Sequence, residues 1–115
     1  MATSPSPLDV FRPDAMAGHV VLVTGGGTGI CRGIAAAYAR FGADVVIVSR
    51  KQDVLDATAR ELCAASGREV IGVAADVRDP EQIKRAIGAT VAKFGKLDTV
   101  VNGAAGNFLA PAAAL

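Results

Sequence analysis

Residues 19–32, HVVLVTGGGTGICR, decide the fold of this chain. An apolar run from Val20 to Val23 leads into Thr24 and three consecutive glycines, and a helical pattern follows from Thr28. Glycine lets the backbone adopt positive φ and brings its N–H groups close to a ligand, while a helix N-terminus adds partial positive charge. A strand, a glycine turn and a helix in this order predict the phosphate-binding loop of a dinucleotide-binding fold.

Composition and charge narrow the class of protein. The chain has 115 residues, 51% of them hydrophobic and 20% charged, which is typical of one small globular domain or part of a larger one. Its net charge of +1 gives no electrostatic argument for nucleic acid or a membrane surface as a partner. No apolar run approaches the ~20 residues of a membrane span, and no metal-ligand spacing is found. We expect both cysteines, Cys31 and Cys63, to be buried and reduced, and His19 to begin a strand.

Strands and helices are predicted to alternate after a loose tail over residues 1–17, so that residues 18–115 form part of a Rossmann-type domain. The apolar patterns predict strands over 19–24, 44–49, 69–75 and 97–102, and helices over 28–41, 53–66 and 80–94, the last one capped by Asp79. Short loops between them indicate right-handed crossovers and an α/β, doubly wound parallel sheet of four strands in the order 3-2-1-4 with three helices. The fourth strand is then an open apolar edge, so we expect the sheet to continue in a longer protein. The helices are expected to face the sheet through Ile30, Ile34, Tyr38 and Phe41 (first), Leu55, Ala59 and Leu62 (second), and Ile83, Ile87, Val91 and Phe94 (third).

Charged residues follow the second predicted strand. Arg50 and Lys51 stand about 20 residues beyond the glycine loop, where NAD-binding sites usually place an Asp or Glu against the ribose 2′-hydroxyl. An arginine there would pair with a 2′-phosphate, which favours NADPH over NADH. The alternative is a solvated Arg-Lys pair at a strand end. Asp53 is expected to cap the following helix.

The spacing Gly25-x3-Gly29-x-Cys31 resembles the TGxxxGxG loop of the short-chain dehydrogenase/reductase family, with Cys31 in place of the last glycine. Residues 102–106, NGAAG, resemble the NNAG loop of that family. Because cysteine is small, we expect only a small packing shift. The resemblance implies that Asp76 accepts from the adenine amino group, with helix capping by Asp76 as the alternative. The implied cofactor-binding residues are Thr24, Gly25, Gly26, Gly27, Thr28, Gly29, Ile30, Arg50, Lys51, Gln52, Asp53, Val54, Asp76, Val77, Asn102 and Ala104.

The segment AAGNFL, residues 104–109, resembles the 2,4-dienoyl-CoA reductases within that family, and residues 11–14 and 29–32 resemble their peroxisomal, fungal-type members. This resemblance implies NADPH-dependent reduction of a 2,4-dienoyl-CoA to a 3-enoyl-CoA in the β-oxidation of unsaturated fatty acids. It further implies a homo-oligomer in the peroxisome, although no C-terminal peroxisomal signal is seen and the cytoplasm is the alternative. Arg50, Arg78 and Phe108 would meet the acyl-CoA, unless Arg78 is a solvated loop charge and Phe108 is part of a core.

No catalytic residue is identified, because the Ser, Tyr or Asp, and Lys of the family have no counterpart here. Tyr38 has Gly42 four residues later, where the family has a lysine, and is expected in the core. We therefore expect the cofactor-binding portion of a reductase, inactive by itself. The alternatives are a 3-oxoacyl or other ketone reductase of the same family, a non-catalytic nucleotide-binding module and a nonfunctional truncation.

Overall fold

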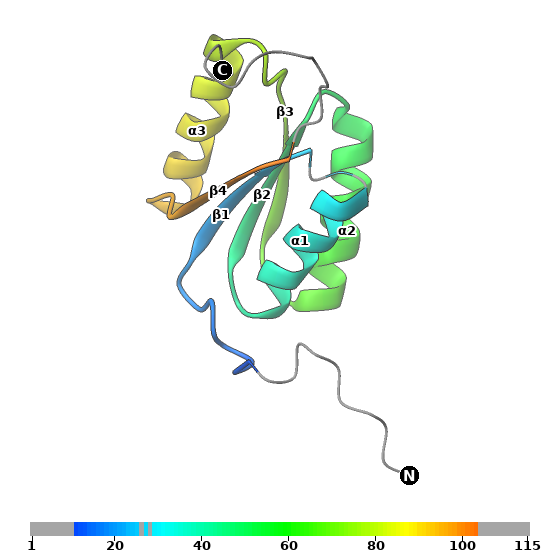
Figure 1. Ribbon diagram of the computed structural model, residues 1–115, viewed down its shortest axis with the longest axis vertical. Coiled ribbons are helices and arrows are strands. Elements are labelled where there is room, and N and C mark those ends of the chain that lie inside the picture. Colours follow the sequence, from blue (N-terminus) through cyan, green and yellow to red (C-terminus); the bar gives the residue numbers. More distant parts are fainter. Residues whose placement is uncertain (1–10, 26, 28, 104–115) are drawn as a thin grey trace, which may run out of the picture.

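The computed structural model describes residues 11–25, 27 and 29–103, and strands alternate with helices throughout (Figure 1). All three strand pairs are parallel and the strand order is β3-β2-β1-β4, which confirms the predicted doubly wound α/β fold. The elements are β1 (Val20–Thr24), α1 (Gly29–Arg40), β2 (Asp44–Ser49), α2 (Gln52–Ser66), β3 (Val70–Ala74), α3 (Pro80–Phe94) and β4 (Thr99–Asn102).

The register of the sheet brings the carboxyl ends of all four strands to one edge. Thr24 of β1 lies opposite Val48 of β2 and Asn102 of β4, and Ser49 lies opposite Ala74 of β3. The chain runs outward from β1 to β3 and then returns to place β4 on the other side of β1. Doubly wound sheets bind their ligands outside the carboxyl ends of the strands, at the point where the strand order reverses in this way.

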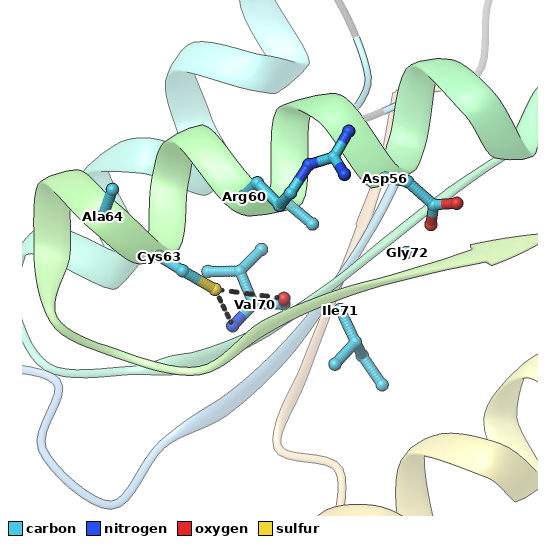
Figure 2. Close-up of a pocket in the computed structure, with 8 residues that line it drawn as sticks. Asp56, Arg60, Cys63, Ala64, Val70, Ile71 and Gly72 are labelled. Carbon is cyan, nitrogen blue, oxygen red and sulfur yellow. Dashed lines mark hydrogen bonds between the residues drawn. The ribbon is translucent and has the colours of Figure 1, made fainter.

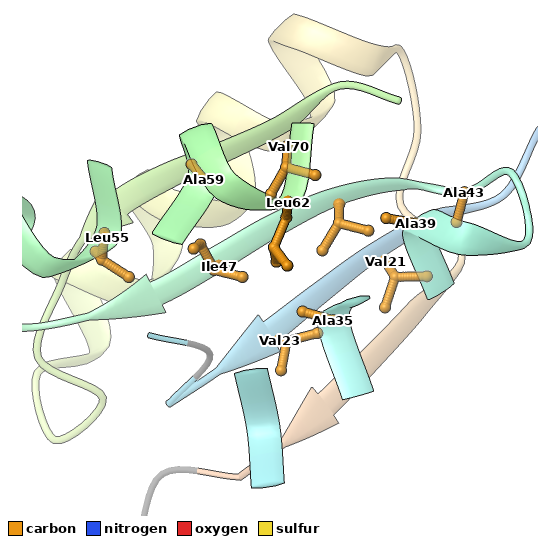
Figure 3. Packing of buried hydrophobic residues seen from close by; sticks show 11 residues of the cluster. Val21, Val23, Ala35, Ala39, Ala43, Ile47, Leu55, Ala59, Leu62 and Val70 are labelled. Atoms are coloured by element: carbon orange, nitrogen blue, oxygen red, sulfur yellow. The ribbon is translucent and has the colours of Figure 1, made fainter. Parts of the chain in front are cut away.

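Helices cover both faces of the sheet: α1 and α2 lie on one side and α3 on the other (Figure 1). Alternate residues of β1 and β2 point to opposite faces, so Val21 and Ile47 pack toward α1 and α2, whereas Leu22 and Val46 pack toward α3. Figure 3 shows the larger of the two clusters. Both strands are therefore buried on both faces, as their unbroken apolar sequences predict.

Helix α1 packs on the sheet through small side chains, and the face predicted for it is wrong in part, since Tyr38 packs against the core but Ile30 does not. Ala35 and Ala39 are buried, whereas Ile30 is 84% exposed. The larger Tyr38 and Phe41 are only half-buried and line an apolar groove shared with the segment that precedes β1. Small residues on the inner face let α1 approach the strands closely, and this displaces the bulky stripe to the side.

The same correction applies in part to α3, while α2 buries the three residues expected of it. In α3 the buried residues are Ala86 and Thr90, and Ile87 and Val91 are 38% and 43% exposed. The Thr90 hydroxyl donates to the Ala86 carbonyl at 2.9 Å, which satisfies its polar group inside the core. Ile83 and Phe94, at the two ends of the predicted stripe, do pack against the core. In the middle, each buried residue comes one position before the predicted one, and apolar spacing alone cannot distinguish such neighbours.

The helix ends follow the sequence. Asp79 caps α3 by accepting from the Glu81 N–H at 3.0 Å, and Pro80 is the first residue of the helix. Both cysteines are free, but they are half-buried rather than fully buried. The His19 ring lies 2.9 Å from the Thr99 hydroxyl, as a structural contact at the start of β1.

The described part of the expected N-terminal tail contacts α1. The Met16 N–H donates to the Phe41 carbonyl at 2.8 Å, and the Phe11 and Phe41 rings meet edge to face. Residues 1–10 lie outside the described residues. Among the helices of residues 11–103, none combines the length and apolar character needed to cross a membrane.

Candidate cofactor-binding site

The turn between β1 and α1 has the backbone that the glycine sequence predicts. Gly25 and Gly29 adopt φ of 72° and 63°, a region that residues with a side chain rarely occupy. The Gly25 N–H donates to the Val48 carbonyl at 2.6 Å, which fixes the turn to the end of β2. Gly26 and Thr28, also predicted to bind the cofactor, lie outside the described residues.

Helix α2 supports this turn from below at Gly27. A Cβ at Gly27 would lie 3.2 Å from a Val54 methyl carbon, so a side chain there would require Val54 to move by a few tenths of an ångström. The Gly27 carbonyl accepts from the Thr58 hydroxyl at 2.9 Å. Thr58 supports the glycine turn through this hydrogen bond, and the sequence analysis missed it. Its only signal is a polar residue on the apolar stripe of α2, three residues after Leu55.

The Thr24 hydroxyl joins the ends of β1 and β4. It accepts from the Gly103 N–H at 2.9 Å and lies 3.3 Å from Asn102 Oδ1. Two of the predicted site residues, Thr24 and Asn102, are therefore in direct contact beside the glycine turn. Ala104 and Phe108 fall outside the described residues.

Arg50 follows β2 directly and is exposed, at the edge where the strands end. The pKa of Asp76 is lowered mainly by hydrogen bonds from Arg78, and the charge of Arg50 is the smallest of the causes. Lys51 is the residue before the first turn of α2, and its side chain is exposed. The expectation that Asp53 caps α2 is wrong, because the helix already begins at Gln52 and Asp53 lies inside its first turn. A carboxylate there still interacts favourably with the helix dipole.

Gln52 connects α2 to the outer edge of the sheet. Its side-chain amide donates to the Gly72 carbonyl at 3.1 Å and accepts from the Ala74 N–H at 3.0 Å. These are two of the backbone groups that a neighbouring strand would pair with. The Gln52 side chain thus holds the loop that carries Arg50 against the end of β3, a role that the sequence did not indicate.

A groove between α2 and β3 lies farther along the outer side of β3 (Figure 2). The Cys63 thiol borders it, accepting from the Val70 N–H at 3.2 Å and lying 3.3 Å from the Val70 carbonyl oxygen. Asp56 and Arg60 are on its rim (Figure 2). None of the predicted site residues lines this groove, so it is separate from the candidate site.

Asp76 and Arg78 form an ion pair in the loop after β3. The Arg78 guanidinium donates from Nε to Oδ1 at 3.1 Å and from Nη2 to Oδ2 at 2.9 Å, and the Arg78 N–H donates to Oδ1 at 2.9 Å. The hydrogen bond from the Arg78 side chain, followed by the one from its backbone, lowers the pKa of Asp76 from the ordinary 3.8 to about 2. Asp76 is therefore an ionised acceptor at neutral pH. Val77, between the two, is 40% exposed.

The choice between Asp76 and Asp79 as the cap of α3 is settled in favour of Asp79. The Asp76 N–H instead donates to Gln82 Oε1 at 2.8 Å, and Gln82 Nε2 donates to Asp79 Oδ2 at 3.0 Å. This network fixes the loop while leaving the Asp76 carboxylate directed to Arg78 rather than to the helix. The carboxylate that the resemblance assigns to adenine is therefore not consumed by capping.

One edge of the sheet thus gathers a glycine turn, a helix N-terminus, a cationic side chain and an ionised carboxylate. This set suits the binding of a phosphate-containing dinucleotide. Within residues 11–25, 27 and 29–103, no three His, Cys, Asp or Glu side chains come together as a metal site.

Comparisons with known proteins agree with this geometry. The family model described as short chain dehydrogenase matches residues 19–115. The chain is 42% identical to a peroxisomal 2,4-dienoyl-CoA reductase of Danio rerio over 92% of this chain and 35% of that protein. It is 45% identical to the protein of the same name from Arabidopsis thaliana, over 89% of this chain and 34% of that protein.

Among solved structures, L-sorbose reductase from Gluconobacter frateurii, complexed with NADPH and L-sorbose, superimposes with a TM-score of 0.79 at 32% identity. The match covers 89% of this chain and 39% of that one. The chain spans about a third of the length of the curated relatives it matches. Fold, glycine turn and sequence agree: the chain belongs to the short-chain dehydrogenase family.

Proposed function

We propose that this chain forms the NADPH-binding part of a reductase that acts on 2,4-dienoyl-CoA thioesters. The observation that carries the choice of NADPH is Arg50, exposed at the end of β2 on the same edge as the glycine turn. An arginine there supplies a charged, bidentate donor to a 2′-phosphate. Asp53, the nearest acidic residue after Arg50, lies inside α2, which further supports the preference.

Different residues of the site would hold different parts of the cofactor. The backbone N–H groups of the glycine turn and the N-terminus of α1 would hold the pyrophosphate. Residues 50–54 would flank the adenosine, and the ionised Asp76 would accept from the adenine amino group. When bound, NADPH supplies the hydride. The part of this chain is to bind it and fix its orientation.

The substrate class rests on the relatives. Both reductases compared above are named for 2,4-dienoyl-CoA reduction and for the peroxisome. By analogy, the product would be a 3-enoyl-CoA in the β-oxidation of unsaturated fatty acids, made in the peroxisome by a homo-oligomer. Arg78, whose side chain is 74% exposed, would turn toward the phosphates of CoA, and Phe108 would contact the acyl group.

A carbonyl reductase of the same family is the second candidate. The observation that favours it is the structural match to L-sorbose reductase, which was solved with NADPH and a sugar. The two candidates share the cofactor site and differ in residues that donate the proton, which the described residues of this chain do not supply.

Turnover separates the two candidates. Because the chain spans about a third of its relatives' length, NADPH consumption is measured on a polypeptide of the relatives' length that contains this chain. We expect consumption with 2,4-hexadienoyl-CoA and little with a 3-oxoacyl-CoA. Turnover of the 3-oxoacyl substrate alone would overturn the dienoyl-CoA assignment and leave the NADPH site intact.

A further inference from the structure

Gly103, the first residue after β4, has no room for a side chain. A Cβ at this position would overlap the sulfur of Cys31 on α1 and would lie 3.0 Å from the Thr24 carbonyl oxygen. Gly103 is not among the glycines with positive φ, so its backbone conformation is open to any residue. A side chain here would have to displace the Cys31 thiol, and glycine leaves that thiol in place.

Cys31 stands at the position of the last glycine in the dinucleotide-binding pattern, the glycine that permits close packing between helix and strand. In this chain the helix carries a side chain at that position, and the end of β4 carries none. The Cys31 sulfur lies 3.5 Å from the Gly103 carbonyl oxygen, within reach of a thiol hydrogen bond. At this contact between helix and sheet, the glycine thus stands at the end of β4 and the side chain stands on α1.

We propose that Cys31 and Gly103 are a complementary pair of positioning residues that sets the path of the chain where it leaves β4 beside the glycine turn. The Gly103 N–H also donates to the Thr24 hydroxyl at 2.9 Å, so moving Gly103 would break the contact that joins β4 to β1. The consequence for cofactor binding rests on the proposed function. The steric complementarity does not.

A set of substitutions isolates the pair. Gly103→Ala introduces the overlap. Cys31→Ala removes the sulfur, so the new Cβ then meets the Cys31 Cβ at 3.5 Å, an ordinary contact, and still meets the Thr24 carbonyl oxygen at 3.0 Å. Cys31→Ser is the matched control, because its hydroxyl keeps an atom where the sulfur was. The five proteins are the wild type, Gly103→Ala, Cys31→Ala, and the doubles of Gly103→Ala with Cys31→Ala or with Cys31→Ser.

Two measurements are made on each protein: the urea midpoint of unfolding, and the affinities for NADPH and for 2′,5′-ADP by calorimetry. We expect Gly103→Ala to lower the urea midpoint and to weaken NADPH binding about tenfold, as overpacking of a tight site does. Binding of 2′,5′-ADP, which lacks the nicotinamide half, should change less than about threefold, because Arg50 and Asp76, proposed to hold the adenosine half, follow β2 and β3. Adding Cys31→Ala should restore part of the loss, because the contact with the Thr24 carbonyl oxygen remains, and adding Cys31→Ser should restore none of it.

The outcomes separate the pair from the cofactor assignment. If Gly103→Ala does not fold but its double with Cys31→Ala does, this rescue of folding by itself supports the steric fit between Cys31 and Gly103. If both doubles behave like Gly103→Ala in both measurements, the pair is refuted. If the wild type binds neither nucleotide while the unfolding midpoints still show rescue, the proposed function fails and the pair stands.

Discussion

Gly25 is the residue on which the glycine turn depends most directly. Its φ of 72° and its 2.6 Å hydrogen bond to Val48 define the first bend after β1. The left-handed conformation costs a residue with a side chain roughly 1–2 kcal/mol in conformational energy, and it costs a β-branched residue more. We therefore expect Gly25→Val to abolish NADPH binding in calorimetry. Gly33→Ala is the control: this exposed glycine of α1 has open space around it, so binding should be kept. NADPH binding by Gly25→Val at wild-type affinity would refute the turn as the phosphate site.

At Asp76 the ion pair with Arg78 predicts a measurable pH dependence. Its pKa is lowered from 3.8 to about 2, so the ionised form stabilises the fold above the ordinary pKa, and this stabilisation is lost as the pH falls through that window. The carboxyl resonance of Asp76 should titrate near the lowered value in NMR. Arg78→Ala should bring the pKa back toward the ordinary one. A wild-type pKa that already equals the ordinary value would show that the pair does not persist in solution.

At the scale of elements, the outer edge of β3 is protected by side chains of α2. Gln52 pairs with the Gly72 carbonyl and the Ala74 N–H, and Cys63 pairs with both backbone groups of Val70. Exposed backbone groups at a sheet edge invite pairing with another chain. Side chains of α2 thus pair with backbone groups of β3 that a further strand would otherwise bind.

Gln52→Ala removes two hydrogen bonds from this edge. A net hydrogen bond contributes about 0.5–1.5 kcal/mol, and these are exposed to water, so we expect a loss of about 1 kcal/mol in the free energy of unfolding. Sedimentation velocity should also show more self-association than in the wild type. Arg60→Ala, an exposed change on the same helix, serves as the control and should do neither. Equal stability and equal sedimentation of Gln52→Ala and the wild type would contradict the protective role.

Sequence patterns predicted the elements well and their packing less well. The unbroken apolar strands and the Asp79 cap are local signals, and each is confirmed. The inner faces of α1 and α3 depend on how closely each helix approaches the sheet, and apolar spacing does not encode this distance. Ile30 was therefore misplaced, and the contacts of Gln52 and Thr58, made across 20 or more residues of sequence, had no local signature.

At the scale of the whole molecule, the strand order places the glycine turn, Arg50 and Asp76 on one edge although they come from three separate loops. That convergence could be predicted once the sheet was recognised as parallel, because the carboxyl ends of its strands then meet. The pairing of Asp76 with Arg78 could not, since a carboxylate and a guanidinium two residues apart have many possible arrangements in a loop. β4 lies at the edge of the sheet with Val100 54% exposed, which agrees with the open edge expected from the sequence.

The central claim is that the carboxyl ends of the strands bind NADPH through Arg50. Calorimetric titration with NADPH and NADH tests this claim most directly. A charged hydrogen bond contributes about 1.5–3 kcal/mol, so NADPH should bind at least about tenfold more tightly than NADH. Arg50→Gln should reduce the preference to near unity, and Arg85→Gln, an equal charge change on α3, should leave it unchanged. Equal affinities of the wild type for the two nucleotides, or a preference that survives Arg50→Gln, would contradict the account.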